Sequence, residues 1–204
     1  KMPRNLIEYI PFGILPLDLP NQSEVDELRS MYGNTPVVLS IMRLQQQEKR
    51  VFDLLMVIDR LRNIYDKPFI YLVVGDGPDR HRAEDLVHSL NLGDYVKFTG
   101  YMDDIKFPCS IARAFFIAGI EDLVGVAGLQ AASVGIPIVS LQMDPEWSGP
   151  DSIFFNSASQ DVLAAELHQL LVDDIYYEER SRYSVSVTRS TFSLYQMAAS
   201  YSRL

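Results

Sequence analysis

The sequence predicts an α/β fold built on a doubly wound parallel sheet, and two observations support this prediction. Short apolar runs recur along the chain and are typical of strands buried on both faces, at residues 37–42, 69–74, 95–98, 114–118 and 136–141. Stretches typical of helices separate them, at residues 49–65, 78–90, 103–112 and 125–134. This alternation implies right-handed crossovers, and it places ligands beyond the carboxyl ends of the strands.

Further elements are expected on both sides of this unit. Residues 6–20 are expected to form a strand and a proline-rich loop, after which Ser23 caps a helix. Two more helices are expected at residues 159–174 and 175–204, and the final stretch of the second covers residues 191–204. Because no repeat or linker divides the chain, residues 1–204 are expected to form a single domain.

The composition excludes several classes of protein. A net charge of -9 argues against nucleic-acid binding, because a phosphate backbone demands a basic face. The apolar runs are far shorter than the roughly 20 residues of a membrane-spanning helix, and a cytoplasmic location is expected. The single cysteine, Cys109, cannot form an internal disulfide and is expected to be a buried thiol. The three histidines are expected at the surface, and no cluster suited to a metal ion is found.

Candidate ligand-binding residues lie where strands give way to helices. Behind the first central strand, Arg43 and Lys49 combine a guanidinium fork with a mobile ammonium group, which suits a diphosphate. The same pair also fits a solvated basic corner beside Glu48. Behind the second strand, Gly75 and Gly77 of VVGDGP permit a tight turn and a close approach of the backbone to a ligand. A plain tight turn explains these two glycines equally well.

Two further corners complete the candidate site. The stretch KFTGYMDD, residues 97–104, offers Gly100 and backbone groups against which a flat base could lie, although its acids also fit the start of a helix. In EDLVGVAGLQAASVGIP, residues 121–137, Gly125 begins a helix whose small side chains let an anion approach the free backbone amides. Asp122, just before it, could hold hydroxyl groups of the ligand. A slim helix packed tightly on the sheet is the alternative interpretation.

Taken in order, these corners resemble the donor-binding half of the group 1, or family 4, retaining glycosyltransferases. The motifs are R-L-x(4)-K, then GDGP, then F-x-G, then an acid eight residues before a second polar residue in a helix that ends in G-x-P. The fourth motif of the family reads approximately E-G-F-G-x-x-x-x-E-A-x-A-x-G-x-P, so Asp122 falls on its first glutamate and Gln130 on its second. The resemblance runs from about Ile10 to the C-terminal residues. It implies the C-terminal, Rossmann-like half of a GT-B fold, with helices at its C-terminal end.

The resemblance also implies a role for each matching residue. Arg43 and Lys49 bind the diphosphate of a nucleotide sugar and stabilise the leaving group, together with backbone amides at the start of the fourth-corner helix. Asp122 accepts hydrogen bonds from the transferred sugar, Gln130 binds the ribose, and the loop of residues 98–102 flanks the base. No metal ion or other cofactor is expected. The implied catalytic residues are Arg43, Lys49 and Asp122, and the implied donor-binding residues are Gly75, Gly77, Phe98, Gly100, Tyr101, Met102, Glu121, Val124, Gly125, Val126 and Gln130.

Several positions depart from the family pattern. Aspartate in place of glutamate at Asp122 shortens the side chain by one methylene, and neighbouring Glu121 is an alternative if the loop shifts by one residue. Gln130 exchanges a carboxylate for an amide, and Met42 replaces the glycine that usually precedes the arginine. Two alternatives to catalysis therefore stay open, namely a non-catalytic module that binds nucleotide sugars and an interaction scaffold derived from the same fold.

The family has a second sheet domain that recognises the acceptor, and the chain, which begins with Lys1, contains no counterpart of it. We therefore expect a piece of a longer hexosyltransferase that turns over little alone. The expected acceptor is a glycan or a lipid-linked glycan, in bacterial surface polysaccharide or lipopolysaccharide biosynthesis. The expected partners are the nucleotide sugar, the acceptor, the N-terminal domain and, peripherally, the inner face of the membrane. Residues 191–204 are expected to cross to that domain, with exposed apolar faces around Phe192, Leu194 and Tyr201.

Overall fold

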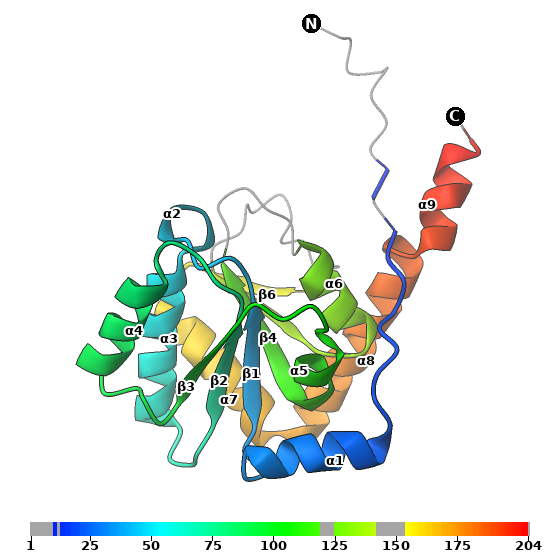
Figure 1. The fold of residues 1–204 in the computed structure, drawn as a ribbon. Coiled ribbons are helices and arrows are strands. Elements are labelled where there is room, and N and C mark those ends of the chain that lie inside the picture. Colours follow the sequence, from blue (N-terminus) through cyan, green and yellow to red (C-terminus); the bar gives the residue numbers. More distant parts are fainter. Residues whose placement is uncertain (1–9, 12, 119–124, 142–153, 204) are drawn as a thin grey trace, which may run out of the picture.

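The computed structural model describes residues 10–11, 13–118, 125–141 and 154–203. They form one six-stranded sheet in the order β3-β2-β1-β4-β5-β6, in which every neighbouring pair is parallel (Figure 1). This arrangement confirms the predicted doubly wound α/β fold. The strands are β1 (Val37–Ile41), β2 (Ile70–Val74), β3 (Val96–Gly100), β4 (Ala112–Ala118), β5 (Ile138–Leu141) and β6 (Phe154–Ser157).

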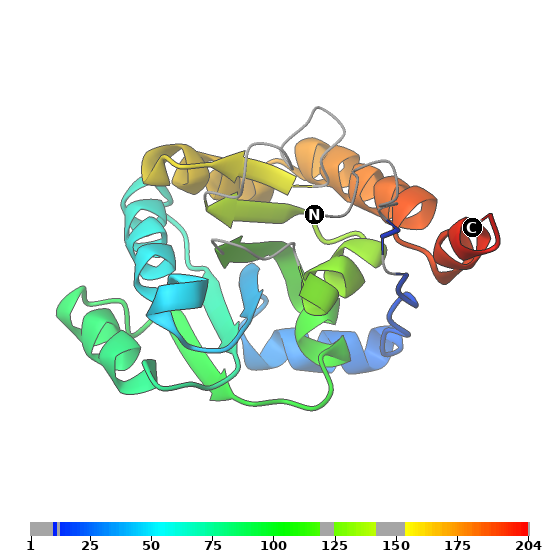
Figure 2. The ribbon, with the colours of Figure 1, turned by 90° about the horizontal axis from the view of Figure 1, so that it is seen from above.

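Helices cover both faces of the sheet, as the view from above shows (Figure 2). Helices α3, α4 and α7 lie against one face, and α1, α5 and α6 lie against the other, with α8 packed on α6 and α7. The helices are α1 (Gln22–Met31), α2 (Gln46–Lys49), α3 (Val51–Ile64), α4 (Arg80–Ser89), α5 (Lys106–Ile111), α6 (Gly125–Ser133), α7 (Gln160–Val172), α8 (Asp174–Thr191) and α9 (Leu194–Tyr201).

Four details differ from the sequence-based expectations. The cap of α1 is Asn21, whose side chain accepts a hydrogen bond from the Glu24 amide, and Ser23 lies within the helix. The helix expected from residue 49 is divided, because Arg50 has a left-handed backbone (φ 50°) that separates α2 from α3. The stretch expected as one helix over 175–204 breaks at Phe192, and the Ser193 side chain caps α9. Strand β6 is an addition that the sequence pattern did not indicate.

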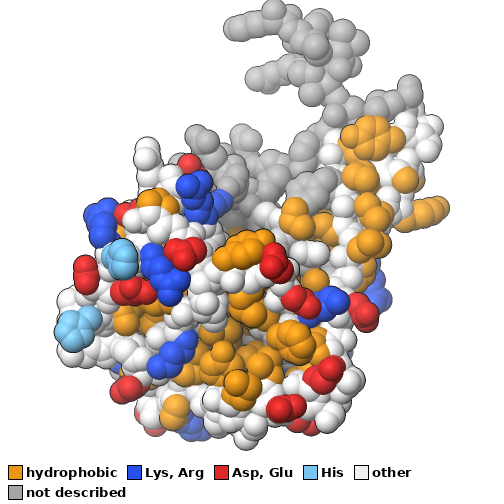
Figure 3. Space-filling view, in the orientation of Figure 1, with side chains coloured by type: hydrophobic (Ala, Val, Ile, Leu, Met, Phe, Trp, Pro, Cys, Tyr) orange, Lys and Arg blue, Asp and Glu red, His pale blue; other side chains and the backbone are white. Residues whose placement is uncertain are grey.

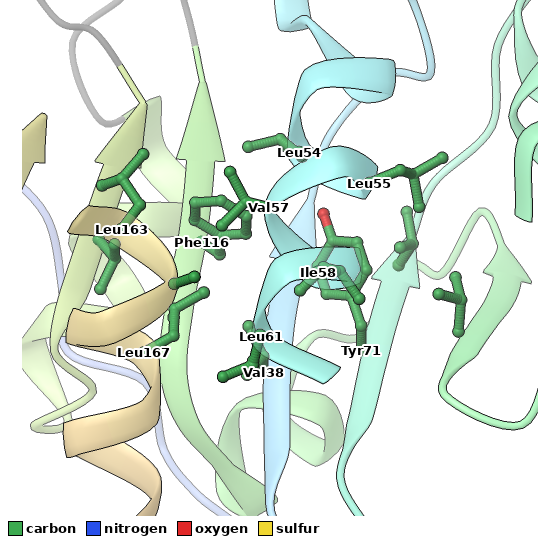
Figure 4. Packing of buried hydrophobic residues seen from close by; sticks show 14 of the residues in the cluster. Val38, Leu54, Leu55, Val57, Ile58, Leu61, Tyr71, Phe116, Leu163 and Leu167 are labelled. Atoms are coloured by element: carbon green, nitrogen blue, oxygen red, sulfur yellow. The ribbon is translucent and has the colours of Figure 1, made fainter. Parts of the chain in front are cut away.

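The hydrophobic core has two layers, one on each face of the sheet. Helix α3 lies over β1 and β2 and contacts α7 (Figure 4). The apolar side chains that recur on its inner face are fully buried, namely Val51, Leu54, Leu55, Val57, Ile58 and Leu61. The largest of the buried side chains include Tyr71, Phe69 and Phe116. The Tyr71 hydroxyl pairs with the Ser40 hydroxyl at 2.8 Å, so this buried phenol has a hydrogen-bond partner.

The strand order determines where a ligand can bind. The chain winds from β1 outward to β3 in one direction, and from β4 outward to β6 in the other, so the order reverses between β1 and β4. Ligands of open parallel sheets bind in the crevice beyond the carboxyl ends of the strands at such a reversal. In Figure 1 these ends point upward, toward α2 and the start of α6.

Candidate functional site

A cavity of about 360 Å³ lies at the carboxyl ends of β1, β2 and β3. Its walls therefore come from the first three corners that the sequence singled out. Most of its lining is apolar, and among the described residues Arg43 and Asp76 contribute charged groups. The lining residues are Ile41, Met42, Arg43, Val74, Gly75, Asp76, Tyr101 and Met102.

Arg43 is held at the cavity by its backbone neighbours. The amide of Met42 donates to the Val74 carbonyl at 3.0 Å, and the amide of Leu44 donates to the Asp76 carbonyl at 3.0 Å. The Arg43 side chain is exposed, and no residue in the described ranges forms a hydrogen bond or ion pair with its guanidinium group. Lys49 is half-buried at the C-terminal end of α2. The structure thus presents a guanidinium group that is available to an anion at the edge of a pocket.

The glycines of the second corner face backbone. A side chain at Gly75 would place its Cβ 2.0 Å from the Met42 carbonyl oxygen, and one at Gly77 would lie 2.4 Å from that of Leu44. These contacts explain why glycine is required there, since any Cβ would push the two segments apart. Gly75 also lines the cavity, whereas Gly77 does not belong to its lining. The tight-turn interpretation accounts for Gly77, and its assignment to donor binding stays a prediction.

The third corner contributes two of its four predicted residues to the cavity, Tyr101 and Met102. Tyr101 is 75% exposed, and the neighbouring Asp103 carboxylate raises the pKa of its phenol. Met102 also packs against the core layer of α1, α5 and α6. Phe98 packs on the opposite face of the sheet, in the layer of α3 and α4.

Gly100 ends β3 outside the cavity lining, and its carbonyl accepts a hydrogen bond from the Gly75 amide at 2.8 Å. The second and third corners are therefore joined through their backbones. Gly100 has φ +77°, which few other residues adopt.

Asp76 supplies the negative charge of the cavity. Its carboxylate accepts a hydrogen bond from the Gly77 amide at 2.7 Å and one from the Arg80 guanidinium at 3.2 Å. The Gly77 amide is the main reason that the pKa of the Asp76 carboxyl group lies below its ordinary value, and Arg80 lowers it further. The group is therefore ionised at neutral pH.

The fourth corner lies beside the first, because β4 is the neighbour of β1. Gly125 begins α6 with φ +66°, and Val126 is 53% exposed in its first turn. Gln130 is half-buried one turn further along the helix. The predicted residues Glu121, Asp122 and Val124 lie outside the described residues.

Sequence reasoning missed four residues of the cavity wall: Ile41, Val74, Met42 and Asp76. The first two are the last residues of β1 and β2. Their places at strand ends were a usable signal, since strand ends form the floor of such crevices. Asp76 belongs to the GDGP motif, from which only the glycines were predicted to bind the ligand.

The structure also bears on the residues expected to have no role in ligand chemistry. Cys109 is buried as expected, and burial raises the pKa of its thiol to about 12. No group of three or more His, Cys, Asp or Glu side chains in the described part of the chain is placed to hold a metal ion. None of the described helices is long and apolar enough to cross a membrane. In the face shown in Figure 3, acidic and basic side chains are interspersed.

The sheet topology and the position of the cavity define a Rossmann-like α/β domain. Within that class the sequence is specific: residues 26–186 match the family model of the glycosyl transferases group 1, and the chain belongs to this family. This finding confirms the resemblance to group 1 glycosyltransferases.

The chain is similar to two lipopolysaccharide core biosynthesis glycosyltransferases of Rhizobium meliloti (strain 1021). It is 25% identical to LpsE over 147 residues, which are 70% of this chain and 41% of the relative. It is 28% identical to LpsD over 125 residues, which are 59% of this chain and 36% of that relative. The chain thus spans well under half the length of these curated relatives.

Solved GT-B glycosyltransferase structures share its fold. The crystal structure of the Anabaena protein HepE in complex with UDP and glucose superimposes with a TM-score of 0.76 at 18% identity. The superposition covers 90% of this chain and 52% of HepE. At this identity the likeness shows the fold alone.

Proposed function

We propose that the chain is the donor-binding part of a retaining glycosyltransferase that uses a nucleoside-diphosphate sugar. The observation that carries this proposal is the cavity at the carboxyl ends of β1–β3 with the exposed Arg43 guanidinium group in its wall. A pocket of this size is in the range that small ligands occupy, and its apolar wall suits a nucleoside. The guanidinium fork suits the diphosphate that follows. The UDP complex of the structurally similar HepE supports this class of ligand.

In the proposed mechanism, protein charges stabilise the departing diphosphate. The bond between the anomeric carbon and the diphosphate oxygen breaks, and its electron pair stays on the diphosphate. Arg43, Lys49 and the free amides at the start of α6 stabilise that charge, and such preorganised electrostatic stabilisation often contributes most of the rate enhancement of an enzyme. The acceptor hydroxyl attacks the same face that the diphosphate leaves, and its proton passes to the leaving phosphate. Because these groups neutralise the developing charge, the proposed reaction needs no metal ion.

The remaining assignments rest on the family pattern. Asp122 orients the transferred sugar, and Gln130 binds the ribose through its amide. The acceptor is a glycan or lipid-linked glycan of the bacterial surface, since the Rhizobium relatives are named for lipopolysaccharide core biosynthesis. Exposed apolar side chains of α9, including Tyr195 at 78% and Tyr201 at 61%, pack in this proposal against the acceptor domain of a longer protein. That protein works at the cytoplasmic face of the membrane.

Calorimetric titration of the purified chain with UDP and with GDP tests the proposal. One of the two nucleotides is expected to bind, and Arg43→Ala is expected to weaken that binding by about 1–3 kcal/mol, because it removes a charged hydrogen bond. Arg189→Ala is the matched control, since Arg189 is an exposed arginine on α8 and should leave binding unchanged. A folded chain that binds neither nucleotide at millimolar concentration, or one in which both variants bind equally well, contradicts the proposal.

A further inference from the structure

We infer that Asp79 is a positioning residue for the diphosphate-binding corner, and this inference rests on the proposed function. Its carboxylate Oδ2 accepts a hydrogen bond from the backbone amide of Gln46 at 2.8 Å, across 33 residues of sequence. Gln46 is the first residue of α2, which ends at Lys49. Asp79 thereby holds the segment that carries both Arg43 and Lys49.

The place of Asp79 in its own helix makes this use of the carboxylate unexpected. Asp79 occupies the N-cap position of α4, where an aspartate side chain ordinarily accepts a hydrogen bond from the first turn of that helix. The side chain makes no such capping bond here. Helix α2, for its part, receives no capping bond from its own N-cap residue, Gln45. The carboxylate of one helix start therefore satisfies an amide at the start of another.

Backbone hydrogen bonds strengthen the same junction. The Asp79 amide donates to the Leu44 carbonyl at 3.1 Å, and the Leu44 amide donates to the Asp76 carbonyl at 3.0 Å. Leu44 is thus anchored between Arg43 and Gln46, and on the other side of Arg43 the Met42 amide donates to the Val74 carbonyl. Removing the Asp79 carboxylate leaves the backbone contacts of Met42 and Leu44 on both sides of Arg43 and releases the segment that follows, from Gln46 to Lys49.

The surroundings of Asp79 favour a fixed, ionised carboxylate. Its side chain is only 16% exposed, and Oδ1 accepts a hydrogen bond from Arg82 at 2.7 Å. The Gln46 amide is the main cause that lowers the pKa of this carboxyl group, with Arg82 as a further cause. The Gln46 side chain extends the connection into α3, because it accepts from the Phe52 amide at 2.7 Å and donates to Asp53 at 2.8 Å.

The test compares Asp79→Ala, Asp79→Asn and the control Asp85→Ala, an exposed aspartate on the same helix. Nucleotide binding is measured by calorimetry with UDP and GDP, and amide hydrogen exchange of residues 43–49 is measured by NMR. Asp79→Ala is expected to raise the dissociation constant about tenfold to a hundredfold, the range of one lost hydrogen bond to a charged group. Asparagine keeps an oxygen that can accept from the Gln46 amide, so this variant should recover most of the affinity. Of the three variants, only Asp79→Ala should speed up hydrogen exchange at the Gln46 amide.

A double-mutant cycle separates positioning from a general loss of stability. In a Lys49→Ala background, Asp79→Ala should weaken binding much less than it does alone, because Asp79 acts through the helix that ends at Lys49. Should Asp79→Ala fail to fold, Asp79→Ser replaces it, since serine can cap α4 but is one atom too short to act like the carboxylate toward Gln46.

The outcomes distinguish this inference from the proposed function. Asp79 variants that bind and exchange like Asp85→Ala overturn the inference and leave the donor-binding proposal intact. Additive losses in the double-mutant cycle also overturn it. A parent chain that binds neither nucleotide overturns the proposed function, and the positioning role with it.

Discussion

Individual residues hold the candidate site together mainly by bringing two backbone segments into contact. The segment Met42–Leu44 runs beside Gly75–Gly77 at a distance that leaves no room for a Cβ. The glycines are needed for this contact, and through it Arg43 is fixed at the cavity. A single added methyl group is therefore a sharp test of the arrangement.

We predict that Gly77→Ala lowers the free energy of unfolding by about 1–3 kcal/mol, the usual cost of forcing extra volume into a packed contact. The new Cβ would lie 2.4 Å from the Leu44 carbonyl oxygen and 2.8 Å from its carbon, so the backbone itself must move. Gly93→Ala is the control, because a Cβ at Gly93 meets nothing within 4 Å. Urea unfolding measures both variants. Equal free energies of unfolding for Gly77→Ala and Gly93→Ala would show that the second corner can accommodate a Cβ.

A second residue-scale prediction concerns Glu166, which is buried between α7 and α8. Its carboxyl group is 6% exposed and accepts hydrogen bonds from the Tyr176 hydroxyl at 2.8 and 3.0 Å. Burial is the main cause that raises its pKa, while the Tyr176 hydrogen bond and the charge of Arg180 partly offset the rise. The folded chain therefore holds this proton at pH values where the unfolded chain has released it. The contribution of Glu166 to stability is full below the ordinary pKa and is lost as pH rises through the raised one.

Glu166→Gln should remove this pH dependence, because glutamine is neutral and can still accept a hydrogen bond from Tyr176. Relative to the parent, the variant should gain free energy of unfolding between about pH 4 and about pH 8. The exposed Glu178→Gln on α8 should show no such gain. Urea titrations at both pH values give the differences, and a constant difference across the range would contradict the assignment.

At the scale of elements, the strands were predictable because each is an apolar run buried on both faces, and β1, β2 and β4 coincide closely with their predicted ranges. Helix starts were harder to predict. Both Asn21 and Ser23 are good capping residues, and only the geometry shows that Asn21 forms the reciprocal pair with Glu24. The break at Arg50 gave no signal either, since a left-handed arginine follows from tertiary contacts and not from propensity.

The candidate site was predictable in the same uneven way. Corner positions followed from strand ends, which brought Arg43, Gly75, Tyr101 and Met102 to one cavity. The directions of the side chains were not predicted. Side chains alternate along β3, and Phe98 points into the core layer of α3 and α4, away from the cavity lining. The hydrogen bond that the Gln46 amide donates to Asp79 could not be predicted from the sequence either, since an aspartate at a helix start predicts a local cap.

The capping of α1 gives a direct test at this scale. Asn21→Ala should lower the free energy of unfolding by about 1 kcal/mol, because the Glu24 amide loses its acceptor. Ser23→Ala should change it by a few tenths of that value or less, since Ser23 is an exposed residue inside the helix. Thermal and urea unfolding of the two variants provide the comparison. A larger loss for Ser23→Ala would support the cap expected from the sequence.

At the scale of the whole molecule, the two ends of the described chain lie against each other. The Ile14 amide donates to the Phe192 carbonyl at 2.7 Å, and the Gly13 amide lies 3.1 Å from the Met197 sulfur. Phe192 packs against the core layer of α1, α5 and α6 and is less exposed than expected, whereas Leu194 at 39% and Tyr201 at 61% match the expected exposure. Hydrophobic side chains are accordingly visible along α9 at the upper right of Figure 3.

This contact between the ends predicts that truncating two adjacent aliphatic side chains, Ile14 and Leu15, lowers the free energy of unfolding by very different amounts. Ile14 is 7% exposed within the core layer that Phe192 joins, whereas Leu15 is 67% exposed. Ile14→Ala should therefore cost about 2–4 kcal/mol of unfolding free energy, the range for emptying a buried aliphatic site. Leu15→Ala should cost about 0.5 kcal/mol or less, as surface substitutions usually do. Urea unfolding measures both values, and limited proteolysis shows whether α9 is released first. Similar small losses for the two variants would mean that residues 13–19 do not anchor the segment of Phe192 and α9 to the rest of the domain.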